Sequence, residues 1–157
     1  CEGISNFGGV RRRYEVHEGP AGGVLVNDYA HHPAEIEAVL AASRLRFPGK
    51  RLLVVFQPHQ YQRTLLLLDA FADALAEADT TLVAEIYGAR ENDEIMASVS
   101  AGDLVSGVRE NGADAHYAGP VAGLAKAVAE HRRAGDVVMV LGAGDIDTAV
   151  ADIVAGL

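Results

Sequence analysis

Apolar residues recur in short runs along the chain, and these runs alternate with segments whose apolar positions follow a helical spacing. Residues 14–16 and 22–28 predict a first pair of strands joined by a turn. Pro33 suits the first turn of a helix, where its missing N–H is not needed. Further strands are predicted at 51–57, 81–87, 115–118 and 136–142, and helices at 33–43, 64–78, 103–110, 121–133 and 145–157.

This alternation predicts an α/β fold, namely a three-layer, Rossmann-like, doubly wound sheet that is mostly parallel. The run at 51–57 is apolar on both faces, as expected of a strand that helices cover on both sides. The short first strand at 14–16 is expected to form an antiparallel edge. No linker divides the sequence, so residues 1–157 are expected to form a single domain.

Composition narrows the range of partners. The formal net charge is −9, so no broad basic face is left for nucleic acid or anionic lipid. No apolar run approaches the roughly 20 residues of a membrane helix, and no signal-peptide pattern is present. The single cysteine, Cys1, excludes an internal disulfide and fits a reducing compartment. We therefore expect a cytoplasmic protein that binds small molecules, with no nucleic-acid or membrane partner.

Polar residues with useful chemistry gather directly after the predicted strands. In a parallel sheet, ligands bind outside the carboxyl ends of the strands. The segments expected there are NDYAHHP (27–33), QPHQYQRT (57–64), YGARENDE (87–94) and GAGDID (142–147). We therefore expect a binding site at this edge of the sheet.

The glycine turn GAGDID is similar to a dinucleotide-binding loop but matches it poorly. Asp147 replaces the third glycine, and Asp145 puts negative charge where a pyrophosphate needs bare N–H groups. A tight turn from strand to helix, capped by Asp145, is the preferred interpretation. The sequence contains no GxxxxGK[ST] phosphate loop, so the main phosphate site for any ATP chemistry is expected outside this chain.

Three side chains in the histidine-containing segments favour an anionic ligand. His31 and His59 can hydrogen-bond a carboxylate or a carbonyl from the edge of the sheet. Arg63 begins an apolar helix, where the helix dipole disfavours a cation unless an anion binds nearby. Ordering of the loops by the histidines, and a surface ion pair for Arg63, are the alternatives. No metal site is expected, because the adjacent side chains of His31 and His32 diverge and no spacing matches a zinc pattern.

Five stretches, in this order and spacing, resemble a known family: GVRRRYEV, NDYAHHPAEI, VVFQPHQYQRT, EIYGARE and VLGAGDI. They resemble the C-terminal domain of the Mur ligases, the ATP-dependent enzymes of bacterial peptidoglycan synthesis. The resemblance extends from about Phe7 to the last residue. Within the family, the YAHHP and FQPH stretches point to the branch that joins L-alanine to UDP-N-acetylmuramate.

The resemblance implies that this chain is the last third of a three-domain enzyme. A first domain would hold the UDP-sugar, and a central ATPase domain would bind most of the ATP and the Mg²⁺. ATP would convert the substrate carboxylate to an acyl phosphate, which the amine of alanine would attack. The present domain alone is expected to be inactive and to work by closing over its own central domain.

The resemblance also implies roles for individual residues. Arg13 would approach the ATP phosphates, and Asp28 would contact the ATP ribose, although a loop-capping role suits Asp28 equally well. The residues implied to surround the alanine are Tyr29, His31, His59 and Arg63. Of these, Arg63 would meet the alanine carboxylate.

Two positions depart from the family pattern, and one alternative function stays open. Gln60 stands where many relatives have arginine, and Asn27 stands where an acid is common, so each position lacks an expected charge. The alternative function is a stand-alone α/β module that binds a small anionic ligand without catalysis. A domain with a GxxxxGK[ST] loop encoded directly upstream would separate the ligase from this module.

Overall fold

A computed structural model describes residues 11–88 and 91–157, and within these ranges the chain forms a six-stranded sheet of order β1-β2-β6-β3-β4-β5. The strands are β1 (Glu15–Glu18), β2 (Val24–Asp28), β3 (Leu52–Phe56), β4 (Thr80–Ala84), β5 (Ala115–Gly119) and β6 (Val137–Leu141). β1 pairs antiparallel with β2, whereas the other neighbouring strands are parallel. The predicted mostly parallel sheet with an antiparallel edge is confirmed.

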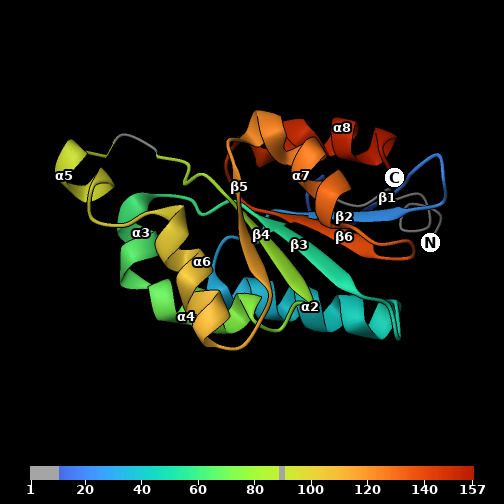
Figure 1. Ribbon diagram of the computed structural model, residues 1–157, viewed down its shortest axis with the longest axis horizontal. Helices are drawn as coiled ribbons and strands as arrows, with labels where there is room; N and C mark the ends of the chain where they lie inside the picture. Colours follow the sequence, from blue (N-terminus) through green and yellow to red (C-terminus); the bar gives the residue numbers. More distant parts are fainter. Residues whose placement is uncertain (1–10, 89–90) are drawn as a thin grey trace, which may run out of the picture.

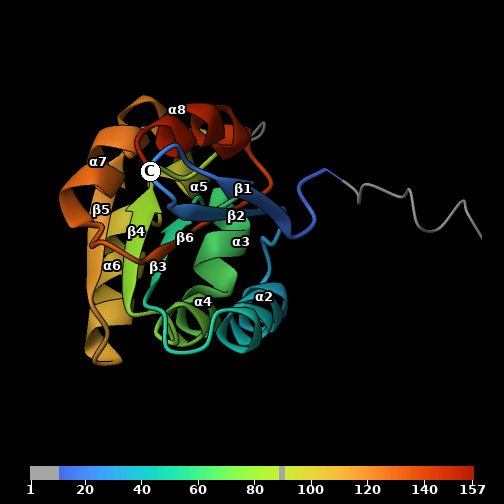
Figure 2. The ribbon, with the colours of Figure 1, turned by 90° about the vertical axis from the view of Figure 1, so that its right-hand side faces the viewer.

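Helices cover both faces of the sheet and give the molecule three layers (Figures 1 and 2). One face carries α2 (Pro33–Arg46), α3 (Tyr61–Leu66), α4 (Leu68–Leu75) and α6 (Ala101–Glu110). The other carries α7 (Leu124–His131) and α8 (Val150–Ala155), which follow the short 3-10 helices η1 (Val121–Gly123) and η2 (Asp145–Ala149). The short helix α5 (Asp93–Met96) lies at one end of the molecule. Across the described residues, no helix has the length and apolar character that a membrane span requires.

The central strands are buried at every position, because helices shield them from both sides. Alternate residues of a strand point to opposite faces. Leu52, Val54 and Phe56 accordingly join the core against α2 and α4, whereas Leu53 and Val55 join the core against α7 and α8. The apolar run of β3 therefore reflects helices that cover both faces of this strand, as the sequence predicts.

Several predicted boundaries are wrong, and the largest differences concern three elements. The helix expected at 64–78 starts at Tyr61, breaks at Leu67 and ends at Leu75, and Leu65 and Leu66 are exposed on its surface. The strand expected at 81–87 ends at Ala84, after which Tyr87 forms one isolated bridge with His59. The closing helix expected from Asp145 begins as the 3-10 helix η2.

The order of the strands brings three of their connections together at the carboxyl ends. β6 lies between β2 and β3. The chain leaves β2 and β3 toward the layer of α2 and α3, but it leaves β6 toward the layer of α8 (Figure 1). Ligands of open α/β sheets bind where neighbouring strands send their connections to opposite faces. The connections after β2, β3 and β6 meet at this place.

Candidate functional site

Asp28 ends β2 and is buried, and its carboxylate holds the surrounding backbone together. Oδ2 accepts the N–H of Tyr14 at 2.6 Å, and Oδ1 accepts the N–H of Ala30 at 2.8 Å. These contacts fit the loop-capping role. The contact with an ATP ribose stays a prediction.

Arg12 is a residue of the site that the sequence does not single out. Its Nη2 donates to the carbonyl oxygens of Gly142 at 2.6 Å and Gly144 at 3.2 Å, and its Cζ lies 4.7 Å from the centre of the Tyr29 ring. Arg13 is exposed and lies 5.6 Å from the same ring. Three consecutive arginines carry no signal to tell which one reaches the distant β6 turn, so only the structure separates them.

His31 is held by both ends of its own loop. Its Nδ1 lies 3.0 Å from the carbonyl oxygen of Tyr29 and 3.4 Å from Oε2 of Glu35. Glu35 also accepts the N–H groups of His31 at 2.9 Å and His32 at 3.2 Å, which caps α2. Burial alone would raise the pKa of Glu35, but the two N–H groups and the charges of His31 and Arg13 offset it and leave that pKa lowered. His32 is the residue that precedes α2.

His59 lies in the connection after β3 and is partly covered by its neighbours. Its ring stacks on Tyr87 with centroids 5.4 Å apart, and it lies 6.3 Å from the ring of His31. Burial first, and then the charges of Arg63 and His31, lower the pKa of His59, while Glu91 acts in the opposite direction. His59 is therefore mainly neutral at pH 7. Its Nδ1 is buried and has no hydrogen-bond partner among the described residues.

Arg63 lies in the first turns of α3, close enough to His59 for its charge to affect the histidine. The Nη1 atom of Arg63 is also buried, and in the described part of the chain nothing accepts its hydrogen bond. A surface ion pair was the alternative interpretation of this residue. No acid pairs with it within residues 11–88 and 91–157.

The glycine turn after β6 is packed against the connection after β3. Gln57 Nε2 donates to Asp145 Oδ1 at 2.8 Å, and Gln57 Oε1 accepts the N–H of Ile146 at 3.0 Å. Capping by Asp145 was therefore a wrong prediction, because the distant Gln57 supplies the capping oxygen. A Cβ on Gly144 would lie 2.5 Å from Gln57 Oε1 and 2.8 Å from Tyr87 Cγ, so close packing explains this glycine.

The structure brings the predicted site residues together at one edge of the sheet. The rings of Tyr29, His31 and His59 follow one another with centroid distances of 5.3 and 6.3 Å, and Arg63 adjoins the last of them. Arg13 lies on the Tyr29 side. A cavity of about 350 Å³ is lined by Gln57, Tyr87 and Asp145, among others, but by none of the predicted site residues. Among the residues that the structure describes, no three His, Cys, Asp or Glu side chains are placed to hold a metal ion.

Comparison with known proteins identifies the family of this chain. A family model described as "Mur ligase, glutamate ligase domain" matches residues 12–144. The chain is 41% identical over 146 residues to UDP-N-acetylmuramate–L-alanine ligase of Clostridium novyi, covering 92% of this chain and 31% of that protein. It is 42% identical over 159 residues to the ligase of the same name from Sorangium cellulosum, covering 99% and 34%.

A solved structure agrees with these relatives. The crystal structure of UDP-N-acetylmuramate–alanine ligase from Thermotoga maritima matches with a TM-score of 0.75 and 27% identity, over 98% of this chain and 31% of that one. The chain thus spans about a third of the length of the relatives that it matches.

Proposed function

The chain belongs to the Mur ligase family, as the C-terminal domain of such an enzyme, and we propose that it binds the amino acid in a ligase that joins L-alanine to UDP-N-acetylmuramate. In the proposed reaction, ATP activates the carboxylate of UDP-N-acetylmuramate as an acyl phosphate. The amine of L-alanine then displaces the phosphate and forms an amide. The product is a precursor of bacterial peptidoglycan, so the enzyme would serve cell-wall synthesis in the cytoplasm.

We propose that residues 1–157 belong to one domain and that the rest of this enzyme lies outside them. Support comes from the relatives, of whose length this chain spans about a third. A first domain would hold the UDP-sugar, and a central ATPase domain would hold most of the ATP and the Mg²⁺. The isolated chain would then be inactive, because it lacks the groups that hold the phosphates.

Two buried nitrogen atoms without partners support the alanine site most directly. Arg63 Nη1 and His59 Nδ1 have no hydrogen-bond partner among the described residues. An unpaired buried donor costs about 1–3 kcal/mol, and a charged one costs more. A carboxylate bound between the two side chains would accept from both. Because the pKa of His59 is lowered, first by burial, its neutral ring can donate without adding a second positive charge beside Arg63.

Tyr29 and His31 would border the other side of the alanine. Nδ1 of His31 is engaged by the carbonyl of Tyr29, which leaves Nε2 as the nitrogen available to a ligand. The ring of Tyr29 packs edge-on against His31 and restricts its orientation. The two residues would fix where the amine of alanine lies relative to the acyl group that it attacks.

The nucleotide would lie beside Arg13 and Asp28. The exposed guanidinium of Arg13 suits the ATP phosphates, because it offsets their negative charge. Each oxygen of Asp28 already accepts one N–H, but a carboxylate oxygen has a second lone pair that a ribose hydroxyl can use. Mg²⁺, where bound, would neutralise charge on the phosphates. Closure of this domain over the central domain would exclude water from the acyl phosphate.

An amide NMR titration of the chain tests the proposed site. We expect the product UDP-N-acetylmuramoyl-L-alanine to shift the signals of residues 28–32 and 59–64. A non-hydrolysable ATP analogue is expected to shift those of Arg13 and Asp28. Nucleotide shifts centred on residues 142–147 would instead support a dinucleotide-binding loop and contradict these assignments.

Kinetics of the full-length ligase supply a second test. Arg63→Gln is expected to raise KM for L-alanine about tenfold to a hundredfold, the size of a lost charge-assisted hydrogen bond. Arg133→Gln removes the same charge from an exposed position at the opposite edge of the sheet and is the matched control. Equal KM values in the two variants would remove Arg63 from the alanine site.

A further inference from the structure

Glu91 lies in the connection between β4 and α5, outside the segments that carry the proposed alanine site. Its carboxylate accepts the first two N–H groups of α3, Oε2 from Tyr61 at 2.8 Å and Oε1 from Gln62 at 2.8 Å. N–H groups in the first turn of a helix have no partner within that helix. Glu91 supplies both partners from about thirty residues away.

We propose that Glu91 is a positioning residue, which holds the first turn of α3 so that Arg63 and His59 face the same bound carboxylate. This role rests on the proposed function, because it assumes that Arg63 and His59 bind the amino acid. Glu91 would act through α3 and would not touch the substrate.

α3 depends on an outside partner because its own sequence provides little to fix its start. The preceding residue, Gln60, has a φ of 72°, a left-handed conformation that costs a residue other than glycine about 1–2 kcal/mol. The side chain of Gln60 makes no capping hydrogen bond. The helix has only six residues, too few to be stable by themselves. The carboxylate of Glu91 therefore sets where α3 begins and in which direction it points.

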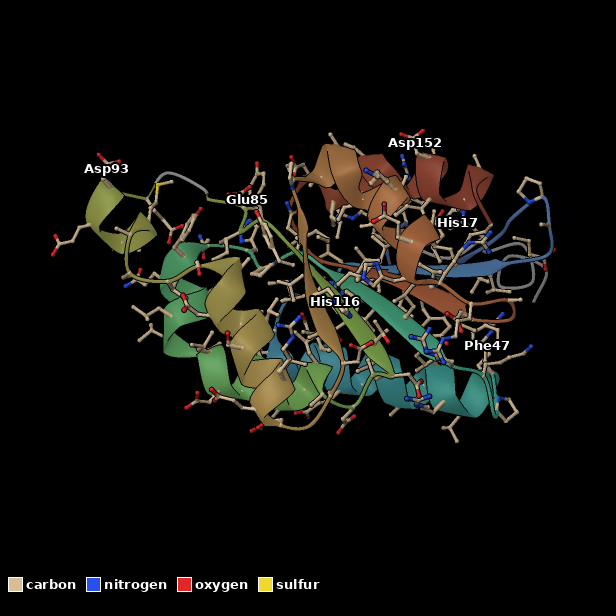
Figure 3. The ribbon with its side chains drawn as sticks, viewed as in Figure 1. His17, Phe47, Glu85, Asp93, His116 and Asp152 are labelled. Carbon is tan, nitrogen blue, oxygen red and sulfur yellow. The ribbon has the colours of Figure 1, made fainter. Side chains whose placement is uncertain are left out.

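The connection that carries Glu91 is itself joined to the connection after β3. Gln60 N–H donates to the carbonyl of Tyr87 at 2.8 Å, and Tyr87 N–H donates to the carbonyl of Pro58 at 2.8 Å. The stack of His59 on Tyr87 lies between these bonds. Figure 3 marks the two ends of the β4–α5 connection by Glu85 and Asp93, and α3 lies beneath it. The two connections thus form one unit that orients the histidine and the arginine together.

The charge of Glu91 also acts on the site. Burial, Arg63 and His31 lower the pKa of His59, and the carboxylate of Glu91 opposes them. The first N–H groups of α3 already donate to Glu91, so a bound anion would contact the guanidinium of Arg63 instead. Substitution of Glu91 therefore has two readouts, the geometry of α3 and the titration of His59, and neither requires substrate.

The test compares Glu91→Gln with Glu94→Gln. Glutamine is isosteric and keeps one accepting oxygen, so the fold should survive, but it loses the charge and one of the two bonds. Glu94 is an exposed residue of α5, and its substitution removes the same charge. We expect Glu91→Gln, but not Glu94→Gln, to shift the amide signals of residues 59–64 and to lower the pKa of His59 measured by NMR. In the full-length ligase, KM for L-alanine should rise about tenfold while kcat changes little.

Arg63→Gln separates failure of this role from failure of the proposed function. If Arg63→Gln raises KM for L-alanine and Glu91→Gln does not, the positioning role is overturned and the alanine site stands. If neither substitution changes KM, both proposals are overturned. An unchanged His59 titration and unchanged α3 amide signals in Glu91→Gln also overturn the positioning role, whatever the kinetics show.

Discussion

The imidazole of His59 stacks on the phenol ring of Tyr87, with centroids 5.4 Å apart and planes 16° from parallel. The two residues follow neighbouring parallel strands, β3 and β4, and a backbone bridge joins them. Burial is the largest cause of the lowered pKa of His59. A side chain from another connection thus helps to keep this histidine neutral.

Tyr87→Ala is expected to raise the pKa of His59 toward the ordinary value of a histidine. The substitution exposes one face of the imidazole to water, and water stabilises the charged form. NMR titration of the His59 ring signals measures the change. Tyr117→Ala, at a tyrosine that is 53% exposed, is the control and should leave the titration as it is. Equal titration in both variants would mean that Tyr87 does not contribute to the burial of His59.

Glu35→Gln is expected to reduce the free energy of unfolding at pH 7 by about 0.5–1 kcal/mol, the lower part of the range for a helix cap. The side chain is 39% exposed, so water screens its charge. The lowered pKa of Glu35 arises because the N–H groups of His31 and His32 and nearby positive charges outweigh burial. Its contribution is therefore complete above the pKa of the unfolded state and is lost as the pH falls through the lowered folded pKa.

Chemical unfolding from pH 7 into the acid range measures this dependence. The difference between the wild type and Glu35→Gln should shrink as the carboxylate of Glu35 takes up its proton. Glu37→Gln removes an equal charge from an exposed position on the same helix and should show little difference at any pH. A constant difference between the wild type and Glu35→Gln across the range would contradict the assignment to ionisation.

Gly144→Ala is expected to destabilise the protein by about 1–3 kcal/mol, as overpacking does. The added Cβ would meet Gln57 Oε1 at 2.5 Å and the Tyr87 side chain at 2.8 Å, and must displace one of them. Thermal unfolding measures the loss. Gly102→Ala is the control, because its Cβ would meet only Ser100 Oγ at 3.4 Å, and alanine favours the helix by about 1 kcal/mol.

Asp136→Ala is expected to reduce stability by about 3 kcal/mol, since it leaves the charge of Arg51 without its partner. Asp136 Oδ2 lies 2.6 Å from Arg51 Nη1 and also accepts the N–H of Arg133. This pair lies at the amino ends of the strands, opposite the proposed site, so product binding should persist in the folded fraction. Asp152→Ala, on the outer surface of α8 (Figure 3), should change neither quantity. An unchanged stability in Asp136→Ala would contradict the prediction.

Local patterns predicted the sheet well because each strand carries its own signal. β3 and β6 are apolar throughout, and Pro33 marks the start of α2. Such features depend on neighbouring residues and on burial alone. They were sufficient to place the histidine-containing segments at one edge of the sheet.

The contacts that fix the site were beyond those patterns, because they join residues far apart in the sequence. Arg12 reaches the carbonyl of Gly142, and Gln57 caps the turn at Ile146. Glu91 caps α3 in the same way. Caps are expected from the residue next to a helix, so an oxygen supplied from another connection leaves no local trace in the sequence.

The position of β6 between β2 and β3 divides the site into two halves. Arg13 and Asp28, proposed for the nucleotide, belong to the β2 half, whereas His59 and Arg63 belong to the half built on β3 and β4. The ring of His31, which follows β2, and the ring of His59, which follows β3, lie 6.3 Å apart across this division. The proposed alanine site spans this division, because Tyr29 and His31 follow β2. Sequence changes in the β3–β4 half can therefore alter one side of the amino-acid site while the residues proposed for the nucleotide stay in place. Such changes would alter which amino acid binds without altering the residues proposed to contact ATP.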